Sequence, residues 1–132
     1  MVSGLMRREE RLTKPQQYAS VYSKGSSWTS SLLVMKALPN GLTSTRYGIS
    51  VSKRVGSAVI RNRMKRLLRE ILRAIPSIPA WDIVFIVRPA AAAADYASLR
   101  EEVEDLLSRA GLLKADEDYG LPDRAEAGSS SG

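Results

Sequence analysis

The sequence predicts an α+β fold, a single domain in which helices cover a small central β-sheet. Segments with the apolar periodicity of helices alternate along the chain with short apolar segments typical of strands. Their order is helix, strand, strand, helix, strand, helix. The 132 residues, 44% of them apolar, suffice for one core of ordinary size.

The first helix is predicted to begin at Thr13 and to end at Gly25. Thr13 and Gln16 have the spacing of a capping box, and Pro15 between them is a residue favoured in the first turn. Gly25 then ends the helix, because glycine is a common residue just beyond a helix.

Two tyrosines, Tyr18 and Tyr22, are four residues apart in this helix and therefore share a face. Spacing alone favours packing in the core over a role as a surface for a ligand. The sequence pattern leaves both interpretations open.

Two strands are predicted next, at residues 31–38 and 46–52, with a turn at residues 39–41 between them. The second strand alternates strictly. One face carries Tyr47, Ile49 and Val51, and the other carries Gly48, Ser50 and Ser52. A face of glycine and serine permits close approach by either a packed helix or a nucleic-acid backbone, and the pattern does not separate the two.

Residues 53–73 form the most basic part of the chain, with eight Lys or Arg among 21 residues and a single acidic residue, Glu70. This segment contributes +7, so the rest of the chain sums to −1 of the net +6. At 3.6 residues per turn it is an amphipathic helix. The apolar stripe is Ile60, Met64, Leu67, Leu68, Ile71 and Ile75, and the opposite face is Asn62, Lys65, Arg66, Arg69 and Arg73.

Beyond Pro76 and Pro79, residues 82–88 are the most apolar strand and are predicted to be central in the sheet. Asp95 is expected to cap a last helix that ends at Gly111. The predicted organisation is a basic flexible arm at residues 1–12, an α+β domain at 13–113 and a disordered tail at 114–132. The tail is acidic and then rich in Gly and Ser, with little to bury.

Composition excludes several kinds of function. The chain has no cysteine and no histidine, so it has no disulfide-linked partner, no thiolate zinc site and no histidine base. No run approaches the roughly 18 to 20 apolar residues of a membrane span, and a cytoplasmic location without membrane contact is expected. The concentrated positive charge instead predicts a nucleic-acid partner, because a solvated helix face normally mixes charges of both signs.

The segment VSKRVGSAVIRNRMKRLLRE, residues 51–70, resembles the signature of the bacterial ribonuclease P protein family. The resemblance extends to RLTKPQQYASVYSKG at residues 11–25 and to YGISVS before the signature, and it covers about residues 7–112. It implies a protein subunit of ribonuclease P, the ribonucleoprotein endoribonuclease that removes the 5′ leader from precursor tRNA. The family implies that the RNA subunit is the catalyst and uses Mg²⁺, while the protein is an accessory without catalytic residues.

The resemblance also implies site residues and topology. Contacts to the ribonuclease P RNA are expected from Lys53, Arg54, Arg61, Asn62, Arg63, Lys65, Arg66 and Arg69. A cleft between the first helix and the sheet is expected to hold the precursor tRNA leader, with Tyr18, Tyr22, Lys36 and Ser50 as candidates. Lys36 and the two tyrosines depart from the tyrosine and phenylalanines common in the family. The basic helix is expected in an unusual left-handed crossover, against the general preference.

Three alternatives compete with this interpretation. An autonomous metal-dependent nuclease needs convergent carboxylates, and the candidates are Glu101, Glu102, Glu104, Asp105 and the acidic residues 116–118. A structural RNA-binding protein of the ribosomal type would explain the basic helix equally well, though not the order of the motifs. A DNA-binding helix-turn-helix is weaker, because no short helix precedes the basic one.

Overall fold

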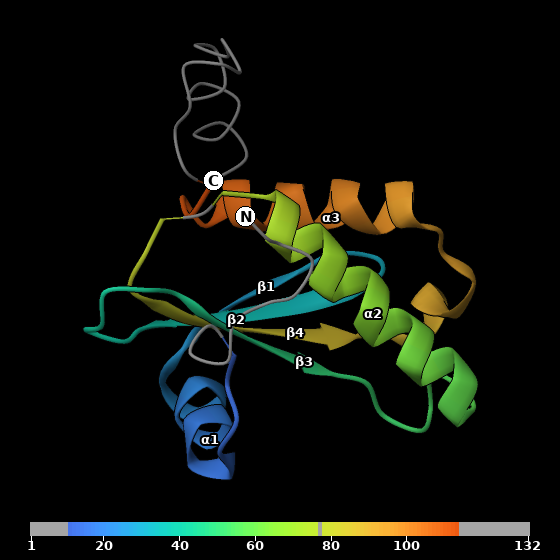
Figure 1. Cartoon of the computed structure of the whole chain (residues 1–132), viewed down its shortest axis with the longest axis horizontal. Coiled ribbons are helices and arrows are strands. Elements are labelled where there is room, and N and C mark those ends of the chain that lie inside the picture. Colours follow the sequence, from blue (N-terminus) through green and yellow to red (C-terminus); the bar gives the residue numbers. More distant parts are fainter. Residues whose placement is uncertain (1–10, 77, 114–132) are drawn as a thin grey trace, which may run out of the picture.

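The computed structural model describes residues 11–76 and 78–113. Their elements in chain order are α1 (Pro15–Lys24), β1 (Ser26–Thr29), β2 (Leu33–Pro39), β3 (Arg46–Ser50), α2 (Ala58–Ala74), β4 (Trp81–Val87), the 3-10 helix η2 (Pro89–Ala93) and α3 (Tyr96–Arg109). The predicted α+β fold is confirmed (Figure 1). The predicted tail lies outside the described residues, as do residues 1–10 of the predicted arm.

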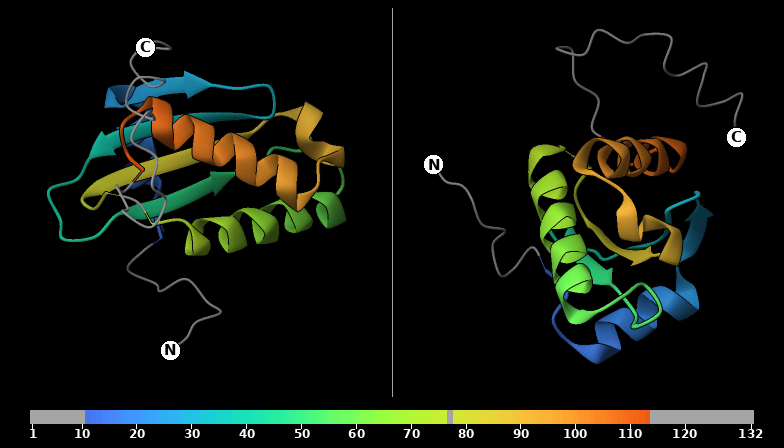
Figure 2. Two further views of the ribbon diagram at one scale, coloured as in Figure 1. Left: turned by 90° about the horizontal axis from the view of Figure 1, so that it is seen from above. Right: turned by 90° about the vertical axis from the view of Figure 1, so that its right-hand side faces the viewer.

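The four strands form one sheet in the order β1-β2-β4-β3. β4 is flanked on both sides, antiparallel to β2 and parallel to β3, so its predicted central place is confirmed. α2 joins the parallel pair β3 and β4. Seen from the side that α2 and α3 cover, with β3 pointing up, β4 lies to the left of β3, so the crossover is left-handed (Figure 2).

Helices cover both faces of the sheet, α2 and α3 on one and α1 on the other (Figures 1 and 2). The larger core lies under α2 and α3, where Met35 of β2 and Phe85 of β4 are fully buried with Met64 and Leu106. The smaller core lies under α1 and contains Leu12, Val21 and Val84. No helix in the described part of the chain combines the length and apolarity needed to span a membrane.

The first helix begins one residue later than the capping pattern predicts. Lys14 is the N-cap, Pro15 is the first helical residue, and Gln17 takes the place predicted for Gln16. The Gln17 Oε1 accepts hydrogen bonds from the backbone N–H groups of Thr13 and Lys14 at 2.8 and 2.9 Å. The reason is Pro15, which has no N–H to donate and is best accommodated at the first helical position. The predicted end at Gly25 is confirmed.

One domain boundary and one strand differ from the sequence prediction. The predicted arm extends to residue 12, yet Leu12 is buried and its backbone N–H donates to the Tyr47 carbonyl at 2.9 Å. Residues 11 and 12 therefore belong to the domain. Strand β1 was not predicted, because of its four residues only Trp28 is even half-buried and the others are small and exposed.

An ion pair fixes the start of the parallel pair. Arg46 of β3 lies opposite Asp82 of β4 in the register, and its Nε and Nη2 donate to the two carboxylate oxygens at 2.8 and 2.7 Å. Asn40 adds a third hydrogen bond to the Asp82 carboxylate. The carboxylate is thus paired, as a buried charge must be.

Candidate nucleic-acid interface

The basic helix α2 is anchored by its apolar side. Ser57 caps it, accepting a hydrogen bond from the Ile60 backbone N–H at 3.4 Å. Met64, Leu68 and Ile71 are fully buried, which confirms the centre of the predicted stripe. Leu72 is also buried and was not assigned to the stripe. This anchoring fixes which cations of α2 reach solvent.

The opposite side of α2 presents the predicted basic surface. Lys53 and Arg54 are exposed in the turn before the helix rather than within it. Along the helix Asn62, Arg66 and Arg73 are exposed, and Lys65 and Arg69 are half-buried. Among the described residues, no cation of this surface forms an ion pair. Its positive charge is therefore not neutralised by paired carboxylates within the described part of the chain.

Arg63 differs from the other predicted RNA contacts, because its guanidinium is used within the protein. Its Nη2 donates to the Ala94 carbonyl at 3.0 Å, at the junction between η2 and α3. A hydrogen bond from the Ser98 backbone, and more weakly the charge of Arg63, lower the pKa of the neighbouring cap residue Asp95. Arg61 is half-buried, and its Nε is buried without a hydrogen-bond partner among the described residues.

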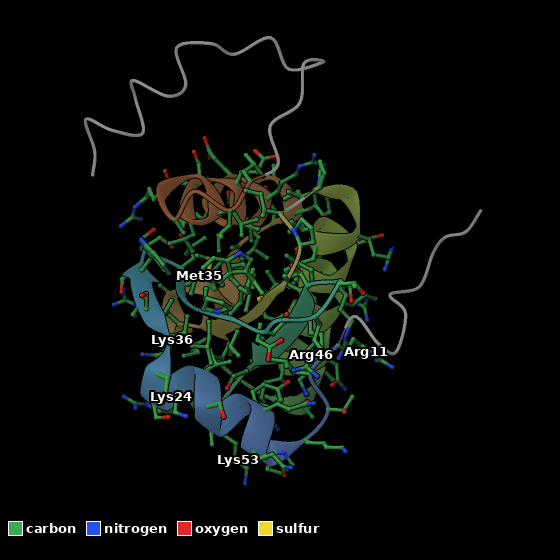
Figure 3. All side chains as sticks on the ribbon, turned by 90° about the vertical axis from the view of Figure 1, so that its left-hand side faces the viewer. Arg11, Lys24, Met35, Lys36, Arg46 and Lys53 are labelled. Atoms are coloured by element: carbon green, nitrogen blue, oxygen red, sulfur yellow. The ribbon has the colours of Figure 1, made fainter. Side chains whose placement is uncertain are left out.

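The four predicted leader contacts lie on the α1 face of the sheet. Lys36 of β2 and Gly48 of β3 flank Val84, and Ser50 of β3 neighbours Ile86 in the next row. Figure 3 shows Lys36 directed toward α1 and Met35 toward the opposite helical layer. Lys36 and Ser50 are half-buried.

The two tyrosines of α1 have different surroundings. Their ring centroids are 6.4 Å apart at an interplanar angle of 50°. Tyr22 is 41% exposed, whereas Tyr18 is half-buried against the small residue Gly48. Burial, and next the neighbouring Tyr22, raise the pKa of Tyr18. At Gly48, therefore, the Gly/Ser face receives a packed helix, and Tyr22 is the tyrosine with a ring available to a ligand.

Three of the four acidic residues of α3 are engaged in local contacts, and the fourth, Glu101, is exposed. The Glu102 carboxylate accepts hydrogen bonds from the Ser30 and Ser31 hydroxyls and from the Leu32 backbone N–H. Glu104 pairs with Arg100 at 3.1 Å and Asp105 with Arg109 at 3.3 Å. Within the described ranges no group of three or more carboxylates is arranged to hold a metal ion. Residues 116–118, the other acidic candidates, lie outside them.

Comparison with known proteins agrees with these features. The ribonuclease P family model matches residues 6–111. The ribonuclease P protein component of Dehalococcoides mccartyi (strain CBDB1) is 46% identical over 113 residues, covering 85% of this chain and 94% of the relative. The corresponding protein of Roseiflexus castenholzii is 43% identical over 112 residues, covering 83% of this chain and 92% of the relative.

Solved structures agree as well. The RNase P protein of Staphylococcus aureus superposes with a TM-score of 0.72 at 31% identity, covering 80% of this chain and 98% of that one. The RNase P protein of Thermotoga maritima gives a TM-score of 0.68 at 32% identity, covering 76% and 96%. With the same fold and matches over most of its length, this chain belongs to the family of ribonuclease P protein components.

Proposed function

We propose that this chain binds the catalytic RNA of ribonuclease P through α2 and the 5′ leader of precursor tRNA through the α1 face of the sheet. Membership in the family makes the chain part of an endoribonuclease holoenzyme. The observation that carries the proposal is the basic surface of α2, whose cations have no acidic partner among the described residues. One guanidinium group can donate two parallel hydrogen bonds to the oxygens of a phosphate, and such contacts supply much of the affinity for RNA.

The leader assignment rests on the α1 face. Unpaired RNA is commonly held by base stacking on aromatic rings beside cationic groups. Tyr22 offers an accessible ring, and Lys36 lies on the same face of the domain. A single-stranded leader is a suitable ligand for this combination.

We place catalysis, and the Mg²⁺ that it uses, in the RNA subunit. The Glu102 carboxylate is occupied by hydrogen bonds to the β1–β2 turn, and Glu104 and Asp105 form ion pairs within α3. The chain also has no histidine or cysteine for acid-base chemistry. The protein then acts by binding and by neutralising phosphate charge.

The test is precursor-tRNA cleavage with Mg²⁺ in three mixtures: the purified protein, a bacterial ribonuclease P RNA, and both together. We expect no cleavage by the protein alone and cleavage at the leader junction when the RNA is present. The benefit of the protein should be largest at low Mg²⁺, because its cations replace counterions. Cleavage by the protein alone that disappears in Glu101→Gln or Asp105→Asn would favour the nuclease alternative.

A structural RNA-binding protein of the ribosomal type predicts another result in the same experiment. Such a protein would bind RNA and leave the rate of leader removal unchanged at every Mg²⁺ concentration. Stimulation by the wild-type protein that is lost in Arg66→Ala would contradict it.

A further inference from the structure

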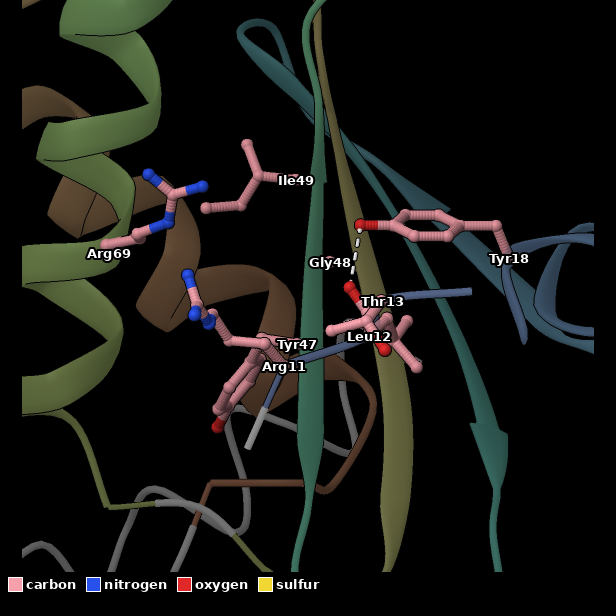
Figure 4. A pocket seen from close by; sticks show the side chains of 8 residues that line it. All are labelled: Arg11, Leu12, Thr13, Tyr18, Tyr47, Gly48, Ile49 and Arg69. Carbon is pink, nitrogen blue, oxygen red and sulfur yellow. Dashed lines mark hydrogen bonds between the residues drawn. The ribbon is translucent and has the colours of Figure 1, made fainter. Parts of the chain in front are cut away.

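The two edges of the sheet differ in how they are covered. At the β3 edge, the Leu12 backbone N–H donates to the Tyr47 carbonyl at 2.9 Å, and the Tyr18 hydroxyl donates to the Leu12 carbonyl at 3.4 Å (Figure 4). At the other edge, β1 is paired only with β2 in the part of the chain that the structure describes (Figure 2). The backbone groups on the outer side of such a strand can pair with another chain.

Strand β1 has none of the features that usually keep an edge strand from pairing. Charged residues, proline and bulges are the common protection. The strand reads SSWT, with no charge and no proline, and its register with β2 is regular from Ser26 to Thr29. Threonine and tryptophan are also residues that favour strands. Protection of this edge therefore has to come from another element.

The outward backbone groups of β1 belong to Ser27 and Thr29. The Ser30 backbone N–H donates to the Leu33 carbonyl at 2.8 Å, across the β1–β2 hairpin. In an antiparallel pair, alternate residues direct their N–H and C=O groups to the partner strand. Trp28 therefore faces β2 as Ser30 does, and the groups of Ser27 and Thr29 face away from it.

Arg109 of α3 occupies one of these outward groups. Its Nη1 donates to the Thr29 carbonyl at 3.1 Å and lies 3.3 Å from the carboxylate of Asp105, one turn earlier in the helix. Beside it, the Ser30 carbonyl accepts a hydrogen bond from Arg88 Nη1 at 2.8 Å. Arginine side chains thus bring to this edge the positive charge that the strand itself lacks.

We propose that the outward edge of β1 pairs with the same edge of a second copy of this chain when it is free, and that Arg109 holds it closed. Two identical edges pair antiparallel about a two-fold axis. With the axis at Trp28, Ser27 of each copy lies opposite Thr29 of the other, and each such pair exchanges both of its backbone hydrogen bonds.

Every one of these pairs needs the Thr29 carbonyl that Arg109 occupies. Pairing would also bring the Arg109 guanidinium groups of the two copies together, and like charges repel each other. Arg109 therefore opposes pairing in two ways, by occupying an acceptor and by its charge. The inference concerns the protein alone and does not depend on the proposed function.

Disulfide crosslinking tests the pairing, because the chain contains no cysteine. One preparation carries Ser27→Cys, a second carries Thr29→Cys, and the two are mixed under oxidising conditions without RNA. Opposite positions would have Cα atoms about 5.5 Å apart, which a disulfide spans. Identical positions would be about 7–8 Å apart or more, beyond its reach. Each preparation alone is therefore the control for the register.

The mixture is compared in the wild-type, Arg109→Ala and Arg100→Ala backgrounds. We expect crosslinking about tenfold faster in Arg109→Ala than in wild type, because each pair of copies gains hydrogen bonds to the Thr29 carbonyls. Arg100→Ala is the matched control and should react at the wild-type rate. Arg100 also pairs with a carboxylate of α3, that of Glu104 at 3.1 Å, and its hydrogen bonds to described residues stay within that helix.

Equal rates in Arg109→Ala and wild type would overturn the proposal. An equal acceleration in Arg100→Ala would also overturn it, since the effect would then come from net charge. Crosslinking of either preparation alone as fast as the mixture would contradict the register. Circular dichroism shows whether each variant is folded, and Arg109→Met, which keeps an unbranched stem and donates no hydrogen bond, should react as fast as Arg109→Ala.

Discussion

The Tyr18 ring lies so close to Gly48 that a β-carbon at position 48 would stand 2.6 Å from the ring Cε1. Real β-carbons essentially never approach another atom this closely, so either the ring or the strand must move if position 48 gains a side chain. This contact joins α1 to the edge strand β3. Glycine at position 48 leaves the space that the Tyr18 ring occupies.

Gly48→Ala should lower the free energy of unfolding by about 1–3 kcal/mol, the usual cost of overpacking. Chemical denaturation measures the change. The matched control is the same substitution in a Tyr18→Leu background, where the shorter side chain removes the clash. An equal loss in both backgrounds would show that the cost comes from the strand rather than from the Tyr18 contact.

Tyr22→Ala should weaken the holoenzyme's affinity for precursor tRNA by about 1–3 kcal/mol, the range for one lost stacking surface. Affinity for mature tRNA, which has no leader, should not change. Stability should fall little, because Tyr22 is 41% exposed. The family resemblance implies the same role for Tyr18, and Tyr18→Ala tests it.

Since Tyr18 packs on Gly48, Tyr18→Ala should lower the free energy of unfolding as well as the affinity for precursor tRNA.

If Tyr22→Ala weakened the affinity for precursor tRNA and for mature tRNA equally, the assignment of Tyr22 to the leader site would be wrong. Tyr22→Phe, which keeps the ring, is the control and should bind like the wild-type protein.

Substitution by alanine should affect RNA binding at Arg66 and the stability of the fold at Arg63. Arg66 is exposed, so Arg66→Ala should leave the fold intact and flatten the slope of log affinity against log salt by roughly 0.7–0.9. Arg63→Ala should cost about 1 kcal/mol of stability through loss of its hydrogen bond to the Ala94 carbonyl. Salt-dependent RNA binding and thermal denaturation of both variants provide the comparison. If the slope of log affinity against log salt were equal in wild type and Arg66→Ala, Arg66 would not contact a phosphate.

The sequence predicts the parts of this fold that depend on local periodicity. The buried stripe of α2, apart from Leu72, was assigned correctly because it repeats with the helical period, and β4 was assigned correctly because it is a continuous apolar run. Strand β1 was missed because an exposed four-residue edge strand has no apolar alternation to recognise. Its pairing with β2 depends on tertiary contacts that no local pattern contains.

In the candidate site, too, local sequence patterns predict some features and tertiary contacts decide the others. The concentration of charge on α2 is visible in the sequence, whereas the inward turn of Arg63 depends on a carbonyl 31 residues away. A signal was nevertheless present, since Arg63 is three residues from Ile60 and four from Leu67 and so lies on the flank of the buried stripe.

Glu102 should make the stability of the domain depend on pH. Partial burial raises the pKa of its carboxyl, but hydrogen bonds from Ser30, Ser31 and the Leu32 backbone, with the charge of Arg88, outweigh this and lower it. A carboxyl whose folded pKa is lowered stabilises the fold above its unfolded pKa of about 4.3, and this contribution is lost as pH falls through the folded value.

Glu102→Gln should therefore be less stable than the wild-type protein at pH 7, with a difference that shrinks as pH falls below about 4. Denaturation at a series of pH values measures this. Glu101→Gln is the matched control, because Glu101 is exposed on the same helix and should show no such pH-dependent difference. A difference for Glu102→Gln that stays constant from pH 7 to pH 3 would show that the ionised carboxylate does not hold the β1–β2 turn.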